Sequence, residues 1–203
     1  MKRFFLICFL FLLFTPLFSA EAPVRILFLG DSLTAGLGVE PREAYPSLIQ
    51  KMLEDKQMHH ITVTNGSISG STTAGALSRL KWFLRAKPDI LVLALGANDG
   101  LRGLSLDEMD KNLDSTIVLA KENQIRVILA GMEIPPNYGP DYTKAFREVF
   151  PSLARRHQIE FIPFLLENVA GDPSLNQADG IHPNARGHRI IAAHVLPFIL
   201  EKP

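Results

Sequence analysis

Near its N-terminus the sequence reads Val24-Arg25-Ile26-Leu27-Phe28-Leu29-Gly30-Asp31-Ser32. A short apolar run that ends at a glycine is typical of a strand buried on both faces. Similar runs recur at 61–65, 89–95, 126–132 and 160–164, and helix-like stretches follow at 45–57, 72–86, 106–123, 141–157 and 187–200. This alternation predicts an α/β domain, a three-layer α/β/α sandwich in which helices cover both faces of a five-stranded parallel sheet.

The composition excludes several classes of protein. The 203 residues suit one domain, and 21 Lys and Arg balance 21 Asp and Glu, so no basic excess is available for binding nucleic acid. One cysteine in the chain rules out a disulfide framework and a cysteine-rich zinc site. The histidines at 59, 60 and 157 lack carboxylates at metal-binding spacing, and segment 66–72 lacks the lysine of a phosphate loop. We therefore expect no metal and no cofactor.

The first twenty residues have the layout of a secretory signal peptide. Lys2 and Arg3 precede an apolar run over 4–14, and Pro16 and the small pair Ser19-Ala20 follow it. We expect residues 1–20 to be removed, leaving a domain over 21–203 that is exported to the periplasm or secreted. That domain is expected to be a monomer without stable membrane insertion. The alternative is an uncleaved N-terminal anchor, for which the apolar run is short.

Polar residues cluster where the predicted strands end. Ser32 follows the first strand, and a serine hydroxyl becomes a good nucleophile only when a base takes its proton. His182 is the candidate base, and Asp179, three residues before it, is the candidate carboxylate that orients the imidazole. The carbonyl under attack develops negative charge, which the backbone N–H groups of Ser32 and Gly70 and the amide of Asn98 are placed to meet. The carboxyl ends of parallel strands share one edge, so we expect these groups to meet there.

Four segments carry a resemblance to a known family. Gly30-Asp31-Ser32-Leu33 resembles the first block of the GDSL, or SGNH, hydrolases, and Gly70 in Ser69-Gly70-Ser71-Thr72 resembles the glycine of the second. Gly96-Ala97-Asn98-Asp99 is similar to the third block and Asp179-Gly180-Ile181-His182-Pro183-Asn184 to the fifth. The resemblance covers essentially all of the chain after the signal peptide.

The resemblance implies a fold and a set of roles. The fold would be the flavodoxin-like SGNH hydrolase sandwich, with Ser32 as nucleophile, His182 as base and Asp179 as its partner. Gly70 and Asn98 would be oxyanion donors together with the Ser32 N–H. Segments 98–103 and 136–139 are similar to a branch of the family with thioesterase, arylesterase and lysophospholipase activity.

We expect a small-molecule substrate with an acyl ester or thioester bond. Apolar residues near the predicted edge favour a fatty-acyl or aryl group, and the tentative substrate-binding residues are Leu101, Leu104, Ile134, Pro135 and Tyr138. Segment 132–139 contains two prolines and a terminal glycine, which is typical of a lid of mostly fixed shape, although an ordinary proline-rich connection has the same composition. Two other functions remain open: a carbohydrate O-deacetylase of the same family, and a non-catalytic periplasmic binding protein.

Overall fold

The structure is a computed structural model that describes residues 22–201; the predicted signal peptide lies outside the described residues. A five-stranded sheet forms its centre, in the order β2-β1-β3-β4-β5 with every neighbouring pair parallel. The strands are β1 (Val24–Gly30), β2 (Ile61–Asn65), β3 (Ile90–Ala94), β4 (Arg126–Ala130) and β5 (Glu160–Ile162). The predicted parallel sheet is confirmed.

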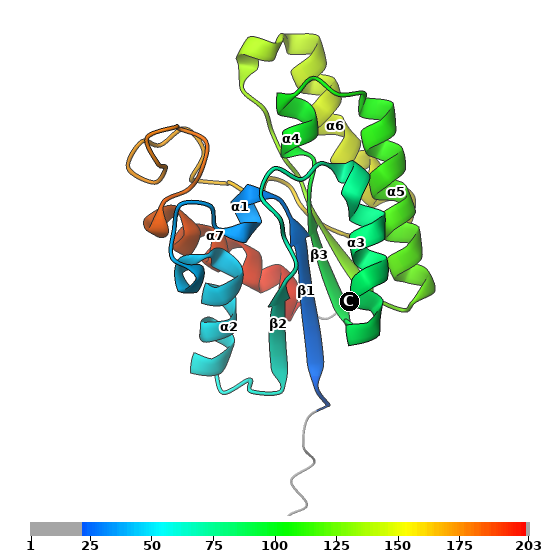
Figure 1. The fold of residues 1–203 in the computed structure, drawn as a ribbon, viewed down its shortest axis with the longest axis vertical. Coiled ribbons are helices and arrows are strands. Elements are labelled where there is room, and N and C mark those ends of the chain that lie inside the picture. Colours follow the sequence, from blue (N-terminus) through cyan, green and yellow to red (C-terminus); the bar gives the residue numbers. More distant parts are fainter. Residues whose placement is uncertain (1–21, 202–203) are drawn as a thin grey trace, which may run out of the picture.

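Helices cover both faces of this sheet (Figure 1). α2 and α7 pack together on one face, while α3 packs on α5 and α5 on α6 on the other. The bounds are α1 (Ser32–Ala35), α2 (Tyr45–Asp55), α3 (Ala76–Phe83), α4 (Ala97–Leu101), α5 (Leu106–Glu122), α6 (Pro140–His157) and α7 (Ala185–Leu200). Short 3₁₀ turns occupy Pro41–Glu43, Thr73–Gly75, Leu84–Ala86 and Pro136–Tyr138. The predicted three-layer sandwich is therefore also confirmed.

The helix expected over 72–86 is shorter in the structure and has a 3₁₀ turn at each end. The first of these turns is held by a side chain from another segment: both the N–H and the hydroxyl of Thr73 donate to the Asp99 carboxylate, at 3.0 and 2.7 Å. A tertiary contact of this kind leaves no signal in helical periodicity, so the sequence prediction merged three elements into one.

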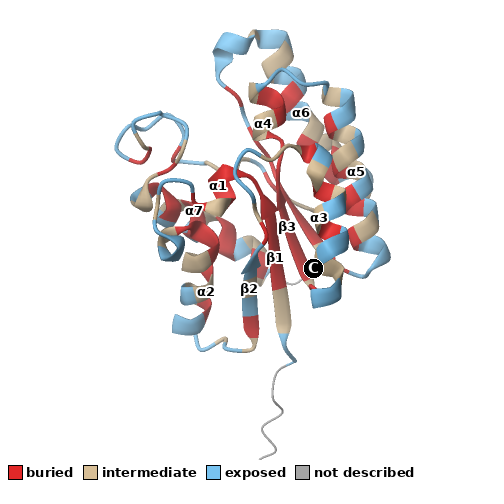
Figure 2. Ribbon diagram, in the orientation of Figure 1, coloured by how far each residue is buried: buried red, intermediate tan, exposed pale blue. Residues whose placement is uncertain are grey.

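The core lies on both faces of β1, β3 and β4, whose residues are buried except at the start of β1 and of β4 (Figure 2). Every residue of β3, Ile-Leu-Val-Leu-Ala, is buried. Continuous apolar runs suit such strands, because neither face meets water. The register places Gly30 beside Ala94 and Phe28 beside Asn65, so the loops after β1, β2 and β3 start at one edge. That edge carries the polar segments.

The outer edge of β2 is closed by a side chain. Gln50, from α2, accepts a hydrogen bond from the Val63 N–H at 2.7 Å and donates to the Ile61 carbonyl at 3.4 Å. These two main-chain groups alternate with those that bond to β1, so they face outward. The carboxamide thus takes the place of a neighbouring strand's peptide group.

Candidate active site

Ser32, His182 and Asp179 form a continuous hydrogen-bonded chain. The Ser32 Oγ atom lies 2.8 Å from His182 Nε2, and His182 Nδ1 lies 2.7 Å from Asp179 Oδ2. Ser32 comes at the first position of α1 and His182 from the loop before α7, 150 residues later. This is the nucleophile–base–carboxylate arrangement that the sequence predicted, with each pair within hydrogen-bonding distance.

The Asp179 carboxylate is held in its ionised form by its own loop. Its Oδ1 atom accepts hydrogen bonds from the Ile181 and His182 N–H groups at 2.9 and 3.0 Å. The backbone N–H and side chain of His182, followed by the Ile181 N–H, lower the pKa of Asp179 to about 2. Three residues of one turn therefore fix the carboxylate, its charge and the orientation of the imidazole.

The backbone at the nucleophile is compact. Asp31 caps α1, since its Oδ1 atom accepts from the Leu33 N–H at 3.0 Å. The end of β1 can lie this close to the Thr34 side chain of α1 only because residue 30 is glycine. A Cβ there would lie 2.3 Å from the Thr34 hydroxyl oxygen. The Ser32 N–H, at the helix start, is one of the first N–H groups that no carbonyl of the same helix can accept from, which is what an oxyanion donor requires.

The other two predicted oxyanion donors come from the loops after β2 and β3. Gly70 has a φ of 78°, a left-handed conformation that favours glycine. The Asn98 Nδ2 atom, at the start of α4, donates one hydrogen bond to the Ser71 carbonyl at 3.1 Å. An amide nitrogen carries two hydrogens, so this bond uses one of them, and the Asn98 side chain also lies by the Asp31 carboxyl. The structure thus brings the loops that carry Ser32, Gly70 and Asn98 to the same edge of the sheet, and Ser32 there contacts the His182 imidazole.

Two arginines that the sequence analysis did not select support these donors. Arg79, from α3, donates to the Gly30 carbonyl at 3.2 Å and to the Ser71 hydroxyl at 2.7 Å. Arg102 donates to the Gly70 carbonyl at 3.0 Å, and its contact with Asn98 Oδ1 is 3.4 Å. Nothing in the sequence distinguishes Arg79 from other helical arginines, whereas Arg102 lies within segment 98–103, which carries the family resemblance.

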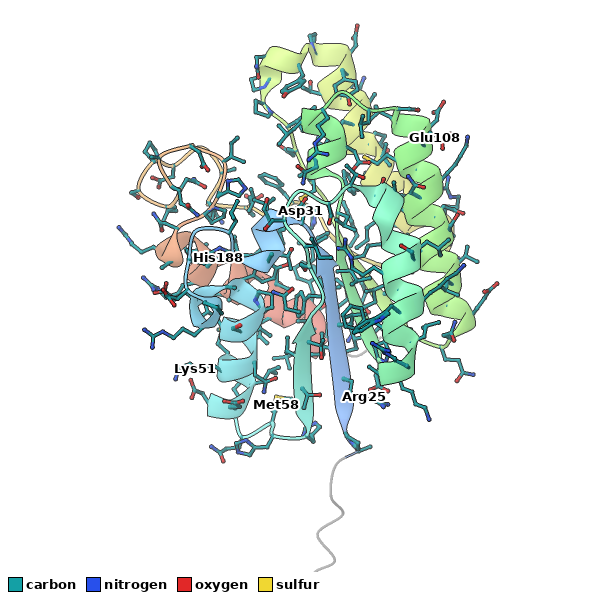
Figure 3. The ribbon with its side chains drawn as sticks, viewed as in Figure 1. Arg25, Asp31, Lys51, Met58, Glu108 and His188 are labelled. Carbon is teal, nitrogen blue, oxygen red and sulfur yellow. The ribbon has the colours of Figure 1, made fainter. Side chains whose placement is uncertain are left out.

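A second carboxyl group, that of Asp31, lies buried next to the nucleophile (Figure 3). Its Oδ2 atom has no hydrogen-bond partner among residues 22–201. Burial raises the pKa of Asp31 to about 6, against the smaller opposing effects of the Leu33 N–H and the nearby Asn98 side chain.

His188 is another titratable group that is buried close to α1. It lies on α7, and its Nδ1 atom accepts from the Tyr45 N–H at 3.3 Å, so the imidazole is neutral (Figure 3). Burial lowers the pKa of His188 to about 4. The Tyr45 hydroxyl in turn lies 3.0 Å from the Thr34 hydroxyl on α1. Sequence analysis placed no catalytic role on His188, and the structure gives it a packing position.

The tentative substrate-binding residues fall into two groups. Leu104, Pro135 and Tyr138 are exposed, and Leu101 is half-buried. Ile134 is only 9% exposed, close to Gly100 and Phe146. The Tyr138 hydroxyl donates to the Leu101 carbonyl at 2.8 Å, which joins segment 132–139 to α4. Segment 132–139 is therefore anchored at Ile134 and Tyr138. Pro135 and Tyr138 are exposed on this segment, and Leu104 is exposed in the loop after α4.

Within the described part of the chain, no group of three or more His, Cys, Asp or Glu side chains is placed to hold a metal ion. No helix over the same residues is long and apolar enough to cross a membrane.

Comparison with known proteins assigns this arrangement to a family. Residues 28–190 match the GDSL-like lipase/acylhydrolase family. The chain is 39% identical to an arylesterase of Vibrio mimicus, over 90% of this chain and 92% of that protein. It is 37% identical to thioesterase 1/protease 1/lysophospholipase L1 of Escherichia coli strain K12, over 91% and 86%. The crystal structure of TesA superimposes with a TM-score of 0.83 at 38% identity, covering 87% of this chain and 98% of that one. The chain therefore belongs to the GDSL-like lipase/acylhydrolase family and is an ester hydrolase of the GDSL type.

Proposed function

We propose that the protein cleaves carboxylic esters or thioesters through an acyl-enzyme intermediate. The observation that supports this is the unbroken hydrogen-bonded chain from Ser32 through His182 to Asp179, at 2.8 and 2.7 Å. A binding protein has no need of such a chain, and the family membership argues for catalysis.

The reaction proceeds in two halves. Ser32 Oγ attacks the carbonyl carbon while His182 Nε2 takes the hydroxyl proton, and the carbonyl oxygen becomes an oxyanion. The Ser32 and Gly70 N–H groups and the Asn98 amide stabilise that charge. The C–O or C–S bond then breaks, His182 returns the proton to the leaving alcohol or thiol, and the acyl group stays on Ser32. Water, deprotonated by His182, then attacks the acyl-serine. The bond from the acyl carbon to Ser32 Oγ breaks, His182 returns the proton to Ser32 Oγ, and the carboxylic acid leaves.

The apolar side chains at the edge of the site favour acyl or aryl substrates, such as lysophospholipid-like or acyl-CoA-like compounds. Leu104 and Tyr138 are exposed, in loops that follow β3 and β4, and an acyl chain lying over them would cover apolar surface. Covering that surface favours an acyl chain over an acetyl group, so fatty-acyl esters are preferred to acetylated carbohydrates.

The nucleophile is tested by Ser32→Ala against a p-nitrophenyl ester. The variant should lose up to ~10⁶-fold in kcat, as other serine hydrolases do without their nucleophile. A serine-reactive phosphonate should label the unaltered protein and not the variant. Ser115→Ala, an exposed serine on α5, is the matched control. Retention of more than a tenth of the activity by Ser32→Ala would exclude this nucleophile, and reversible inhibition by EDTA would contradict metal-free chemistry.

We propose in addition that the protein is exported and that residues 1–20 are removed. The charged start, apolar run and small residues of this segment support the proposal. Mass spectrometry of the protein from a Gram-negative host should find it in the periplasm or medium, shortened by about that segment. A full-length chain in the membrane fraction would indicate the uncleaved anchor instead.

A further inference from the structure

A groove lies beside the catalytic edge, where the loop after β2 faces α3. It encloses about 560 Å³ and is lined mainly by Gly66, Ile68, Ser78, Arg79, Trp82 and Phe83. A volume in this range is typical of sites for small organic ligands. The proposed mechanism uses none of these side chains directly.

The apolar side chains of the groove are unusually open to solvent. Ile68 is 57% exposed and Trp82 is 56% exposed, the two highest values for large apolar side chains among the described residues. Single exposed apolar residues need no explanation, but here the two most exposed line one concave site. Exposed apolar side chains that line one groove are typical of a ligand-binding site.

The groove is continuous with the catalytic turn. The Ile68 N–H donates to the Gly30 carbonyl at 3.2 Å, two residues before the nucleophile. Arg79 lines the groove and donates to the same carbonyl. Gly70, an oxyanion donor, is two residues after Ile68. The Ile68–Arg79 end of the groove therefore lies next to the catalytic turn.

The aromatic wall of the groove suits a flat ring. Trp82 and Phe83 are in edge-to-face contact, with ring centroids 4.6 Å apart and planes at 83°. The Arg85 guanidinium lies 3.6 Å from the Trp82 ring centroid and covers one of its faces. A rigid ring against such a wall gains edge-to-face or offset-stacking contacts, which a flexible alkyl chain does not make.

The sheet order decides which part of the substrate reaches this groove. Ser32 follows β1, the groove follows β2 on one side of it, and the rim residues Leu104 and Tyr138 follow β3 and β4 on the other. The acyl and alcohol parts of an ester extend in opposite directions from the carbonyl carbon. If the acyl part lies over the rim, the alcohol part extends toward the groove.

We propose that the groove between the β2 loop and α3 is a subsite for an aromatic ring on the alcohol side of the ester. The proposal rests on the ester hydrolysis proposed above and specifies its leaving group. Substrates of this class are aryl and arylalkyl esters, whose released alcohol carries the ring.

The chain supplies its own reporter of occupancy, because Trp82 is its one tryptophan. Titration of Ser32→Ala with benzyl alcohol should give a saturable change in tryptophan emission, and hexan-1-ol should give a much smaller one. Adding Ile68→Ser should weaken the benzyl alcohol response, whereas adding Val118→Ala, an exposed apolar residue of α5, should not. An absent or non-saturable response would overturn the proposal, as would equal responses to the two alcohols.

Kinetics provide the second measurement. Trp82→Ala should lower the ratio of kcat/KM for phenyl acetate to that for ethyl acetate by roughly tenfold, and Val118→Ala should leave the ratio unchanged. Ethyl benzoate carries its ring on the acyl side, so its kcat/KM should fall less in Trp82→Ala than that for phenyl acetate. An unchanged ratio in Trp82→Ala would remove the groove from the substrate site, and a larger loss for ethyl benzoate would assign it to the acyl side and overturn the proposal.

The two measurements separate this proposal from the proposed hydrolysis. A saturable benzyl alcohol signal without turnover of any ester by the unaltered protein would support a ring-binding groove and reject the hydrolase. Ester turnover without a tryptophan signal and without a changed kcat/KM ratio in Trp82→Ala would support the proposed hydrolysis and reject the ring-binding groove.

Discussion

Asn98 is proposed to stabilise the transition state without contributing to the binding of the substrate. In the proposed mechanism its amide, which donates one hydrogen bond to the Ser71 carbonyl, meets charge that develops only after attack. Asn98→Ala should therefore lower kcat by roughly 10²–10³-fold, with little change in KM. Steady-state kinetics with a p-nitrophenyl ester measure both values. A raised KM at constant kcat would identify Asn98 as a binding residue instead.

Asp179 is the carboxylate partner of the His182 imidazole. Because its pKa is lowered to about 2, it stays ionised as pH falls through the ordinary range of aspartate, so loss of activity above about pH 4 cannot come from its protonation. Asp179→Asn should reduce kcat by roughly 10⁴-fold, as the equivalent change does in other triads. It should also move the acid limb to lower pH, because the neutral amide no longer stabilises the imidazolium. A kcat/KM profile against pH tests this, and an unmoved limb would count against the pairing.

At the scale of elements, the rim formed by the loops after β3 and β4 should set acyl selectivity. Each methylene buried is worth ~0.8 kcal/mol, so kcat/KM should rise about fourfold per carbon until the rim is covered. Leu104→Ala should flatten that rise between butanoate and octanoate esters and barely affect acetate. Val118→Ala is the control, and an unchanged slope in Leu104→Ala would remove this loop from the acyl site.

Ile134 should act on segment 132–139 through packing. Since it is 9% exposed against α4 and α6, Ile134→Ala should cost about 2–5 kcal/mol of unfolding free energy. It should also flatten the acyl-length preference, because the segment loses one of its two anchors. Urea unfolding measures the first effect. A stability change under about 0.5 kcal/mol, the range of ordinary surface substitutions, would show that the anchor is not needed.

The strands were predictable because their apolar runs are long and buried on both faces, as in β3. α1 and α4 were not, because four or five residues are too few for helical periodicity. Ser32, His182 and Asp179 could be selected from chemistry and from the motif. The Arg79 contacts with Gly30 and Ser71 could not, since they depend on how α3 packs beside the β2 loop.

For the whole molecule, two buried groups should make opposite contributions to stability against pH. His188 has its pKa lowered to about 4, so as pH falls from about 6.5 the unfolded chain binds a proton that the folded protein does not, and stability falls. Asp31 has its pKa raised to about 6, so stability falls as pH rises from about 4 to 6. Each contribution is about 3 kcal/mol.

Between pH 4 and 6 the loss of stability from Asp31 with rising pH nearly offsets the gain from His188, so the two slopes nearly cancel in the unaltered protein. Asp31→Asn removes one of them, so its stability should rise with pH over this interval relative to the unaltered protein. His188→Gln should show the reverse slope. Urea unfolding at a series of pH values measures both, and parallel curves for the two variants would show that neither group titrates as its burial implies.

The Gln50 carboxamide at the outer edge of β2 also has a consequence for behaviour in concentrated solution. An unprotected edge strand offers its peptide groups to other chains and so invites intermolecular β-pairing. Because Gln50 already bonds to the Val63 N–H and the Ile61 carbonyl, these two groups are not available to pair with a strand of another molecule. Gln50→Ala should therefore keep the fold and its catalytic site while shortening the lag before fibrils or turbid aggregates form on storage, so that one glutamine governs how long the protein remains dispersed.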